Sequence, residues 1–166
     1  SKEKSGKWRN LHFPLFLLIE FPRMEIQPAN LLDLAALRKL EHTCFEKDAW
    51  PLLDLIAVLT WPEVIRLKVV ENGEMIAFAA CDPRPSQSLA WIATIAVDPR
   101  WQRRGIGRML LHACEERTKQ PRLKLSVRIS NHGAIALYER EGYQTVDVWG
   151  RYYSDQEDAL VMEKIL

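Results

Sequence analysis

A short basic stretch with two glycines is the part of the chain whose residue types and spacing are suited to chemistry. Residues 102–107 read Gln-Arg-Arg-Gly-Ile-Gly, and Arg108 follows. Glycine lets a backbone approach a ligand closely, and arginine side chains are strong donors to phosphate. The first amides of a helix lack internal partners and carry partial positive charge. If a helix begins here, the stretch predicts a cradle for an anion, best suited to a phosphate or pyrophosphate.

The segments on either side of this stretch predict a strand and a helix that position it. Residues 92–97 are uncharged and rich in β-branched and small apolar side chains, which predicts a central strand buried on both faces. Asp98 and Pro99 end that strand, because proline lacks a backbone donor and restricts the residue before it. An apolar stripe at helical spacing follows the loop: Ile106, Met109, Leu110, Ala113 and Cys114.

The loop matches neither of the two commonest phosphate-binding loops. It lacks the Gly-Lys-Ser/Thr ending of a P-loop, and Gly105 and Gly107 lack the third glycine of a dinucleotide fingerprint. Gly-x-Gly alone favours a simpler interpretation, a helix start with surface arginines. The strand before it and the residues after it favour a ligand-binding loop.

In this context the chain resembles the GNAT (GCN5-related) N-acetyltransferase family. Gln-Arg-Arg-Gly-Ile-Gly after a strand ending Val-Asp-Pro is similar to motif A of that family, Gln/Arg-x-x-Gly-x-Gly/Ala. Further matches resemble its ribosomal-protein alanine N-acetyltransferase branch, and they lie at residues 127–131, 134–139, 142–143, 152–153 and 157–162. The resemblance implies acetyl-CoA as co-substrate, with its pyrophosphate bound by the backbone amides of the loop.

The resemblance implies an α/β fold of mixed α+β type. Its sheet is central, mixed, mostly antiparallel and seven-stranded, splayed at the cofactor site and flanked by about four helices. The sequence pattern runs β-α-α-β-β-β-α-β-α-β-β, in the order that the family implies. The expected strands are residues 24–26, 64–70, 75–80, 92–97, 123–128, 143–153 and 159–165. The expected helices are residues 34–44, after a cap at Asn30 with Asp33, then 52–60, a helix from 106 toward Pro121, and 131–141. Asn72 and Gly73 predict a hairpin turn, and residues 83–88 predict a loop.

The family's motif residues imply roles for particular positions of this chain. Backbone groups of residues 95–97 would pair with the pantetheine arm as an extra strand, and Asn131 would contact the cofactor. Tyr138 would protonate the departing sulfur of CoA as the catalytic acid; without the family it reads as a core aromatic. The expected cofactor-binding residues are Ile95, Ala96, Val97, Gln102, Arg103, Arg104, Gly105, Ile106, Gly107, Arg108, Asn131 and Tyr138.

The acceptor side departs from the branch at one position. The branch carries a glutamate two residues before Arg128, whereas this chain has Ser126, which is no base near neutral pH. The carboxylates that remain as alternatives are Glu41, Glu46, Asp48, Glu157 and Asp158. Because an α-amine has a pKa of ~7.7–8.0, against ~10.4 for lysine, a site without a strong base better tolerates an N-terminal acceptor. Tyr152, Tyr153 and Glu46 are the expected substrate-binding residues.

Composition limits the function classes. With 48% hydrophobic and 27% charged residues the chain is globular, and a net charge of +1 gives no overall field for nucleic acid. Three cysteines without Cys-x-x-Cys predict neither a disulfide framework nor a metal site, which fits a cytoplasmic protein. We expect an extension over residues 1–22 and one catalytic domain over residues 23–166. The apolar run at 13–19 is too short to span a membrane, and an amphipathic docking segment is one interpretation of it.

Three functions remain open from the sequence. The first is transfer of an acetyl group from acetyl-CoA to a protein N-terminal α-amine, by direct attack in a ternary complex rather than through Cys81 or Cys114. The second is acetylation of a small amine such as a polyamine or an aminoglycoside. The third is an acetyl-CoA-binding module without catalysis, which Ser126 keeps open.

Overall fold

The computed structural model describes residues 24–46 and 48–166. The expectations for residues 1–22 lie outside this range. Seven strands form one sheet in the order β1-β2-β3-β4-β5-β7-β6, in which β4 and β5 are parallel and every other neighbouring pair is antiparallel. The strands are β1 (Ile26–Pro28), β2 (Ile65–Glu71), β3 (Glu74–Arg84), β4 (Leu89–Val97), β5 (Arg122–Arg128), β6 (Gln144–Trp149) and β7 (Ala159–Ile165). The predicted mixed, mostly antiparallel, seven-stranded sheet is confirmed.

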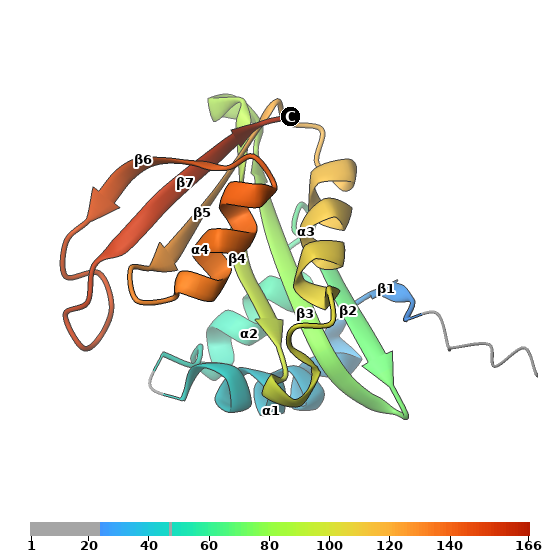
Figure 1. Cartoon of the computed structure of the whole chain (residues 1–166). Helices are drawn as coiled ribbons and strands as arrows, with labels where there is room; N and C mark the ends of the chain where they lie inside the picture. The colour runs from blue at the N-terminus through green and yellow to red at the C-terminus, as the bar shows by residue number, and fades with distance from the viewer. Residues whose placement is uncertain (1–23, 47) are drawn as a thin grey trace, which may run out of the picture.

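Four α-helices flank the sheet, as predicted. They are α1 (Leu34–Phe45), α2 (Leu52–Thr60), α3 (Ile106–Arg117) and α4 (His132–Arg140). The 3-10 turns are η1 (Leu31–Asp33), η2 (Pro85–Gln87) and η3 (Pro99–Trp101). Figure 1 shows α3 and α4 on one face of the sheet and α1 and α2 on the other. In the described part of the chain, no helix combines the length and the apolar character that crossing a membrane requires.

Two hydrophobic clusters, one on each face of the sheet, form the core. Alternate residues of β3 supply both clusters: Ala77 and Ala79 face the cluster beneath α3, whereas Phe78 and Ala80 face the one beneath α1 and α2. Because side chains alternate along a strand, a central strand must be apolar at every position, as β3 is from Met75 to Cys81. β3 is therefore the strand buried on both faces.

β4 parts from β5 halfway along its length. The two strands pair only from Ala90 with Leu123 to Ile92 with Leu125. A β-bulge follows at once, because Ala80 and Cys81 of β3 pair with Thr94 and Ile92 and leave Ala93 as the extra residue. Beyond the bulge Ala93 is exposed, and Ile95 and Val97 are only half-buried. The prediction that this strand is buried on both faces is wrong for this half, along which β5 no longer pairs with β4.

Local signals set most element boundaries. Asn72 and Gly73 form the predicted hairpin turn, with φ of 51° and 78°. Asn30 and Asp33 form the predicted cap: the Asn30 side chain accepts the Leu32 amide and the Asp33 carboxylate accepts the Asn30 amide, both at 2.9 Å. Asn131 caps α4, its side-chain oxygen accepting the amide of Ala134 at 3.1 Å.

Several predicted strand boundaries are wrong, among them the start of β4, which is Leu89 rather than residue 92. β1 begins at Ile26 rather than at residue 24. β3 continues through Pro83, where a loop was predicted. Its pairing with β2 reaches only Cys81, so Pro83 lies on a part of β3 that pairs with β4 alone and is an edge, where proline is tolerated. β6 ends at Trp149 rather than at residue 153, because the chain turns back there and the Arg151 amide donates to Asp158 Oδ1 at 2.8 Å.

Candidate functional site

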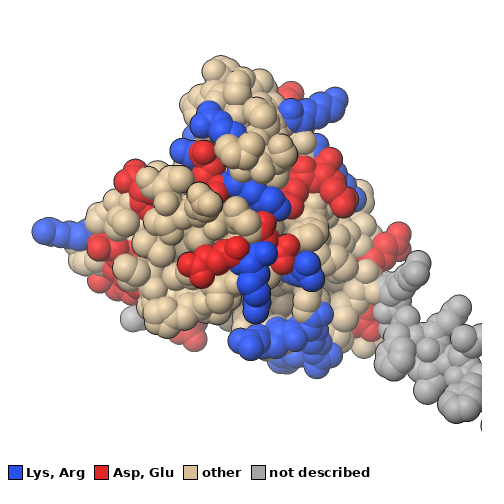
Figure 2. Space-filling view, turned by 45° about the horizontal axis from the view of Figure 1, so that its top comes forward, with Lys and Arg blue, Asp and Glu red and all other residues tan. Residues whose placement is uncertain are grey.

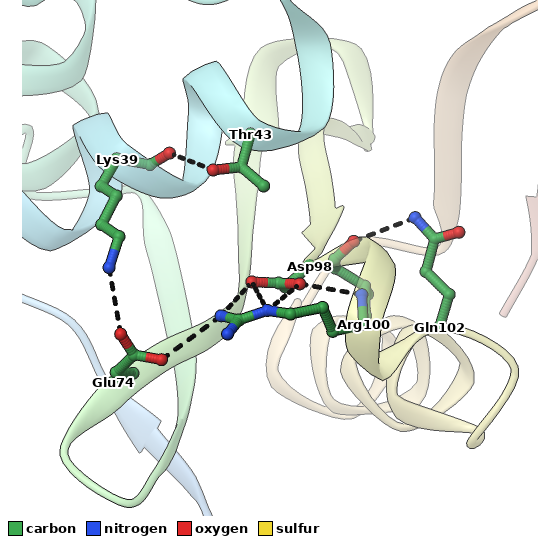
Figure 3. A network of polar contacts seen from close by, with 7 residues as sticks. Lys39, Thr43, Glu74, Asp98, Arg100 and Gln102 are labelled. Atoms are coloured by element: carbon green, nitrogen blue, oxygen red, sulfur yellow. Dashed lines mark hydrogen bonds and ion pairs between the residues drawn. The ribbon is translucent and has the colours of Figure 1, made fainter.

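The glycine-bearing loop joins the open half of β4 to α3. Arg103 and Gly105 have φ of 63° and 81°, so the chain turns sharply twice before the helix begins. The Gln102 side chain donates to the Val97 carbonyl at 3.0 Å and ties the loop to the end of β4 (Figure 3). The Met109 amide makes the first bond of the α3 ladder, to the Gly105 carbonyl at 3.0 Å. The amides before Met109 are therefore outside the ladder and available to an anion.

The three arginines of this loop lie in different surroundings. Arg104 lies over the Trp101 ring, 4.6 Å from its centroid. Arg108 Nε lies 2.7 Å from Glu141 Oε1, and His112 Nε2 lies 2.5 Å from the other oxygen of that carboxylate. His112 and Arg108 hold the pKa of Glu141 below its usual value. Arg103 is exposed. Figure 2 shows Lys and Arg side chains gathered at the lower edge of one face, with acidic side chains elsewhere on it.

Gly107 lies in the first turn of α3, where the fold itself does not require glycine. A Cβ built there would lie 3.8 Å from both Leu137 Cδ2 and Val97 Cγ2, which is ordinary van der Waals contact. Gly105 differs, because its positive φ is one that other residues rarely adopt. The packing of the chain alone therefore does not account for glycine at position 107.

The open half of β4 presents backbone groups along one edge. The Asp98 amide donates to the Ile76 carbonyl of β3 at 2.9 Å. Because alternate residues of a strand donate to the same side, the Ala96 amide also points to β3, and those of Ile95 and Val97 point away from it. That second side faces β5, whose pairing with β4 has ended at Ile92. The edge has the pattern that an additional strand would pair with.

An ion-pair network holds the end of β4 against α1 and the β2–β3 hairpin (Figure 3). Arg100 bridges Asp98 at 2.8 Å and Glu74 at 3.3 Å, and Lys39 of α1 reaches Glu74 at 3.0 Å. The Asp98 side chain also accepts the Arg100 amide at 2.9 Å, and Arg100 lowers the pKa of that buried carboxyl. The strand end and η3, which together aim the loop, are thereby fixed from two sides.

Tyr138 lies on α4, two turns after Asn131. Its ring is 5.9 Å from that of Tyr143, and it packs against the core cluster beneath α3. Burial, reinforced by the nearby Tyr153, raises the pKa of Tyr138 to about 12. The phenol therefore stays protonated at neutral pH, the state required of a proton donor.

Arg128 ties together the two loops on the opposite side of the opening. Its guanidinium binds Asp48 in the α1–α2 loop, and Asp155 and Glu157 in the β6–β7 loop, with both oxygens of Asp155 at 3.1 Å. The Ser154 hydroxyl also donates to Asp48 at 2.7 Å, which joins the two loops directly. The sequence assigned no role to Arg128, because its three partners come from two distant segments.

The structure places the predicted acceptor residues in two different loops. Tyr153 lies beneath Arg128, which is 3.9 Å from its ring centroid, and Tyr152 packs edge-on against Tyr153 and is 53% exposed. Both belong to the β6–β7 loop. Glu46 is exposed at the end of α1, directly after the helix.

The five candidate bases lie in different surroundings. Burial raises the pKa of Glu41, which is 1% exposed and accepts the Trp50 amide at 3.4 Å. The pKa of Asp48 is lowered by Ser154 and Arg128, and that of Glu157 by Ser130 and Arg128. The others are Glu46, described above, and Asp158, which accepts the Arg151 amide.

Known proteins resemble this chain in sequence. The model of the acetyltransferase (GNAT) family matches residues 34–143. The ribosomal protein bS18-alanine N-acetyltransferase of Escherichia coli is 39% identical over 104 residues, covering 59% of this chain and 69% of that protein. The catalytic subunit of the N-terminal acetyltransferase A complex of Arabidopsis thaliana is 28% identical over 148 residues, covering 85% of this chain and 77% of that protein.

Solved structures resemble it in fold. The crystal structure of the ribosomal-protein-S18-alanine N-acetyltransferase from Escherichia coli superposes with a TM-score of 0.75 at 32% identity, covering 85% of this chain and 92% of that one. A NatC complex bound to a Gag peptide and CoA superposes with a TM-score of 0.75 at 22% identity, covering 86% and 98%. At that identity the second likeness concerns the fold alone.

Proposed function

The chain belongs to the acetyltransferase (GNAT) family, and on that basis we propose that it transfers an acetyl group from acetyl-CoA to a protein N-terminal α-amine. The observation that carries the proposal is the opening between β4 and β5, with the glycine-bearing loop at one side and the Arg128 loops at the other. The free cysteines agree with a reducing, cytoplasmic setting.

The residues around the loop fit a CoA pyrophosphate. Backbone amides ahead of Met109 would bind the phosphate oxygens at the positive end of α3, and Gly107 would leave room for them. Arg103 and Arg104 extend from the same loop and would add charge. The amides of Ile95 and Val97 would pair with the pantetheine arm, as a strand would, and Asn131 would contact the cofactor from the start of α4. When bound, acetyl-CoA supplies the activated acetyl thioester.

Tyr138 is the proton donor in this proposal. Departure of CoA leaves a thiolate, and protonating it favours the forward reaction. A tyrosine with a pKa raised to about 12 carries its proton throughout the physiological range. The acceptor amine would attack directly, because burial raises the pKa of the Cys114 thiol to about 12 and Cys81 is fully buried beside it. Neither cysteine is suited to be a nucleophile.

The acceptor amine needs no strong base if it is an α-amine. Its ordinary pKa of ~7.7–8.0 leaves a sizeable fraction neutral at cellular pH, whereas a lysine amine costs roughly 3.5 kcal/mol more to neutralise. Ser126 is therefore compatible with turnover. Glu41 is buried beneath the α1–α2 loop, where its contact with the Trp50 amide suits a structural role.

The side chains of the β6–β7 loop favour a polypeptide over a polyamine acceptor. Asp48, Asp155 and Glu157 converge on Arg128, which offsets one of their three negative charges. Charge alone therefore does not decide between the two acceptors. Tyr152 and Tyr153 in the same loop suit hydrogen bonds to a peptide backbone, which favours a polypeptide acceptor.

The test is release of CoA from acetyl-CoA with a panel of acceptors. Peptides with free N-termini, the same peptides with blocked N-termini, spermidine and free lysine are compared. Turnover confined to the free N-termini is expected. Turnover on spermidine alone would assign the chain to small amines. Acetyl-CoA binding without turnover on any acceptor would make it a non-catalytic module.

A further inference from the structure

Four aromatic side chains from three segments form a continuous row. Trp91 of β4 stacks on Trp149 of β6 with centroids 5.5 Å apart and planes 28° apart. Trp149 contacts Tyr152 at 5.1 Å, and Tyr152 contacts Tyr153 at 5.1 Å. We call these four residues the aromatic row.

The row begins where β4 and β5 part. Trp91 pairs with Lys124, one position before the last pair of the two strands. The flanking residues of β5, Leu123 and Leu125, point into the core cluster beneath α3, so Lys124 and Trp91 lie on the opposite face. From there the row passes to the end of β6 and ends at Tyr153, beneath Arg128. It thus connects the closed end of the opening with the loop that borders its mouth.

Cations of the protein lie over both ends of the row. Arg84 and Lys124 lie 5.8 and 5.9 Å from the centroid of the Trp91 ring, and Arg128 covers Tyr153. At the Trp91 end each cation has a carboxylate partner, Asp82 at 3.1 Å for Arg84 and Glu163 at 3.2 Å for Lys124. At the Tyr153 end the three carboxylates of the two loops share Arg128, so the row offers ring faces and edges along its length and a net negative charge near Tyr153.

We propose that the acceptor polypeptide lies along the aromatic row, downstream of its reacting N-terminus. The inference rests on the proposed function and deepens it, because it assigns a surface to the part of the acceptor that does not react. The row is continuous with the opening where the amine must meet the thioester. Its three steps of 5.1–5.5 Å match about five residues of extended chain, at about 3.3 Å per residue. Tyr152 is 53% exposed and so accessible to such a chain.

Peptide length is the variable that tests the proposal. A series with one common N-terminal dipeptide, extended to eight residues, is assayed for kcat/KM with the wild-type chain. We expect kcat/KM to rise about tenfold between two and six residues and then to level off, mainly through KM. Trp149→Ala is expected to reduce that rise to less than about threefold, and Tyr152→Ala serves as a second variant on a more exposed side chain. Val148→Ala is the matched control, since Val148 is 51% exposed on the adjacent position of β6 and points to the other face.

Each outcome decides the proposal. A flat length series, or a rise that Trp149→Ala and Tyr152→Ala both leave intact, overturns it. So does a wild-type dimer, by sedimentation, that Trp149→Ala dissociates, because the row would then bind a second copy of the chain. Binding of an N-terminally blocked eight-residue peptide, followed by the fluorescence anisotropy of a dye on the C-terminus of the peptide, needs no turnover. If that binding depends on Trp149 while no free N-terminus is acetylated, the row stands and the proposed function fails.

Discussion

The guanidinium carbon of Arg128 lies 3.9 Å from the centroid of the Tyr153 ring. The same group binds Asp48 in the α1–α2 loop and Asp155 in the β6–β7 loop. One side chain at the end of β5 thus contacts both loops of the proposed acceptor side, and Tyr153 of the β6–β7 loop. Tyr153 in turn lies close enough to Tyr138 to raise its pKa.

Arg128→Lys is expected to weaken acceptor binding. Lysine keeps the charge but lacks the planar fork that binds several carboxylates and stacks on a ring. The acceptor KM is expected to rise about tenfold, and the free energy of unfolding to fall by about 1–3 kcal/mol. Steady-state kinetics and denaturant unfolding measure the two effects. Arg122→Lys, at the far end of β5, is the control; an equal change in KM for both variants would contradict a specific role for Arg128.

Tyr138→Phe is expected to lower kcat about 100-fold, the loss typical of a missing general acid. The affinity for CoA, measured by calorimetry, is expected to stay within about twofold of wild type. Because the pKa of Tyr138 is about 12, the wild-type rate is expected to show no alkaline loss from this group below pH ~10. An unchanged kcat in the phenylalanine variant would remove Tyr138 as the acid.

Gly107→Glu is expected to abolish acetyl-CoA binding, because its bulk and negative charge would meet the phosphates at the start of α3. Gly107→Ala separates this effect from folding. Its Cβ would make only ordinary contacts at 3.8 Å, so its melting temperature is expected to stay near wild type or to rise slightly. Calorimetry with CoA and thermal unfolding of both variants are the measurements. Full CoA affinity in the glutamate variant would place the phosphates elsewhere.

Glu41→Gln is expected to change the pH dependence of stability. Burial raises the pKa of Glu41, so above the usual value of 4.5 the folded chain holds a proton that the unfolded chain releases. This group therefore lowers the free energy of unfolding as pH rises through that window. Glutamine keeps the oxygen that accepts the Trp50 amide but does not titrate, so the stability of the variant relative to wild type is expected to increase as pH rises above 4.5. Urea unfolding across that range measures the difference.

The same variant tests the role of Glu41 in the reaction. With a structural role, kcat is expected to stay within about threefold of wild type at every pH. A large loss of kcat in a folded variant would instead identify Glu41 as the base.

Elements with strong local patterns could be predicted from the sequence, two of them to the residue at both ends. α2 and β7 begin and end where their apolar patterns do, and the turn at Asn72 and Gly73 needed only two residues to be recognised. The glycine-bearing loop was equally local, since its strand, turn and helix follow one another along the chain. Such predictions depend on residue propensity and hydrophobic periodicity, both of which can be read from a short stretch of the sequence.

Contacts between distant segments could not be predicted in that way. Arg128 and Asp48 are 80 residues apart, and Ser154 and Asp48 are 106 apart, yet together they join the two loops of the proposed acceptor side. Trp91 and Trp149 stack on each other although β5 and β7 lie between their strands in the sheet. The strand prediction through residue 153 failed for a related reason. Aromatic residues favour strands, but hydrogen bonds within the β6–β7 loop outweigh that preference, among them the Tyr153 amide to the Glu157 carbonyl at 3.1 Å.

Only three residue pairs join β4 to β5, between Ala90 and Ile92 on one side and Leu123 and Leu125 on the other. The sheet thus has two parts, β1–β2–β3–β4 and β5–β7–β6, which are joined at these three pairs. The width of the opening between β4 and β5 depends on the angle between the two parts. A small rotation at these three pairs becomes a larger displacement at the far end of the opening, toward the glycine-bearing loop and the β6–β7 loop. A substitution of a side chain packed at these three pairs can therefore change that angle and lower the activity of the enzyme without contacting either substrate.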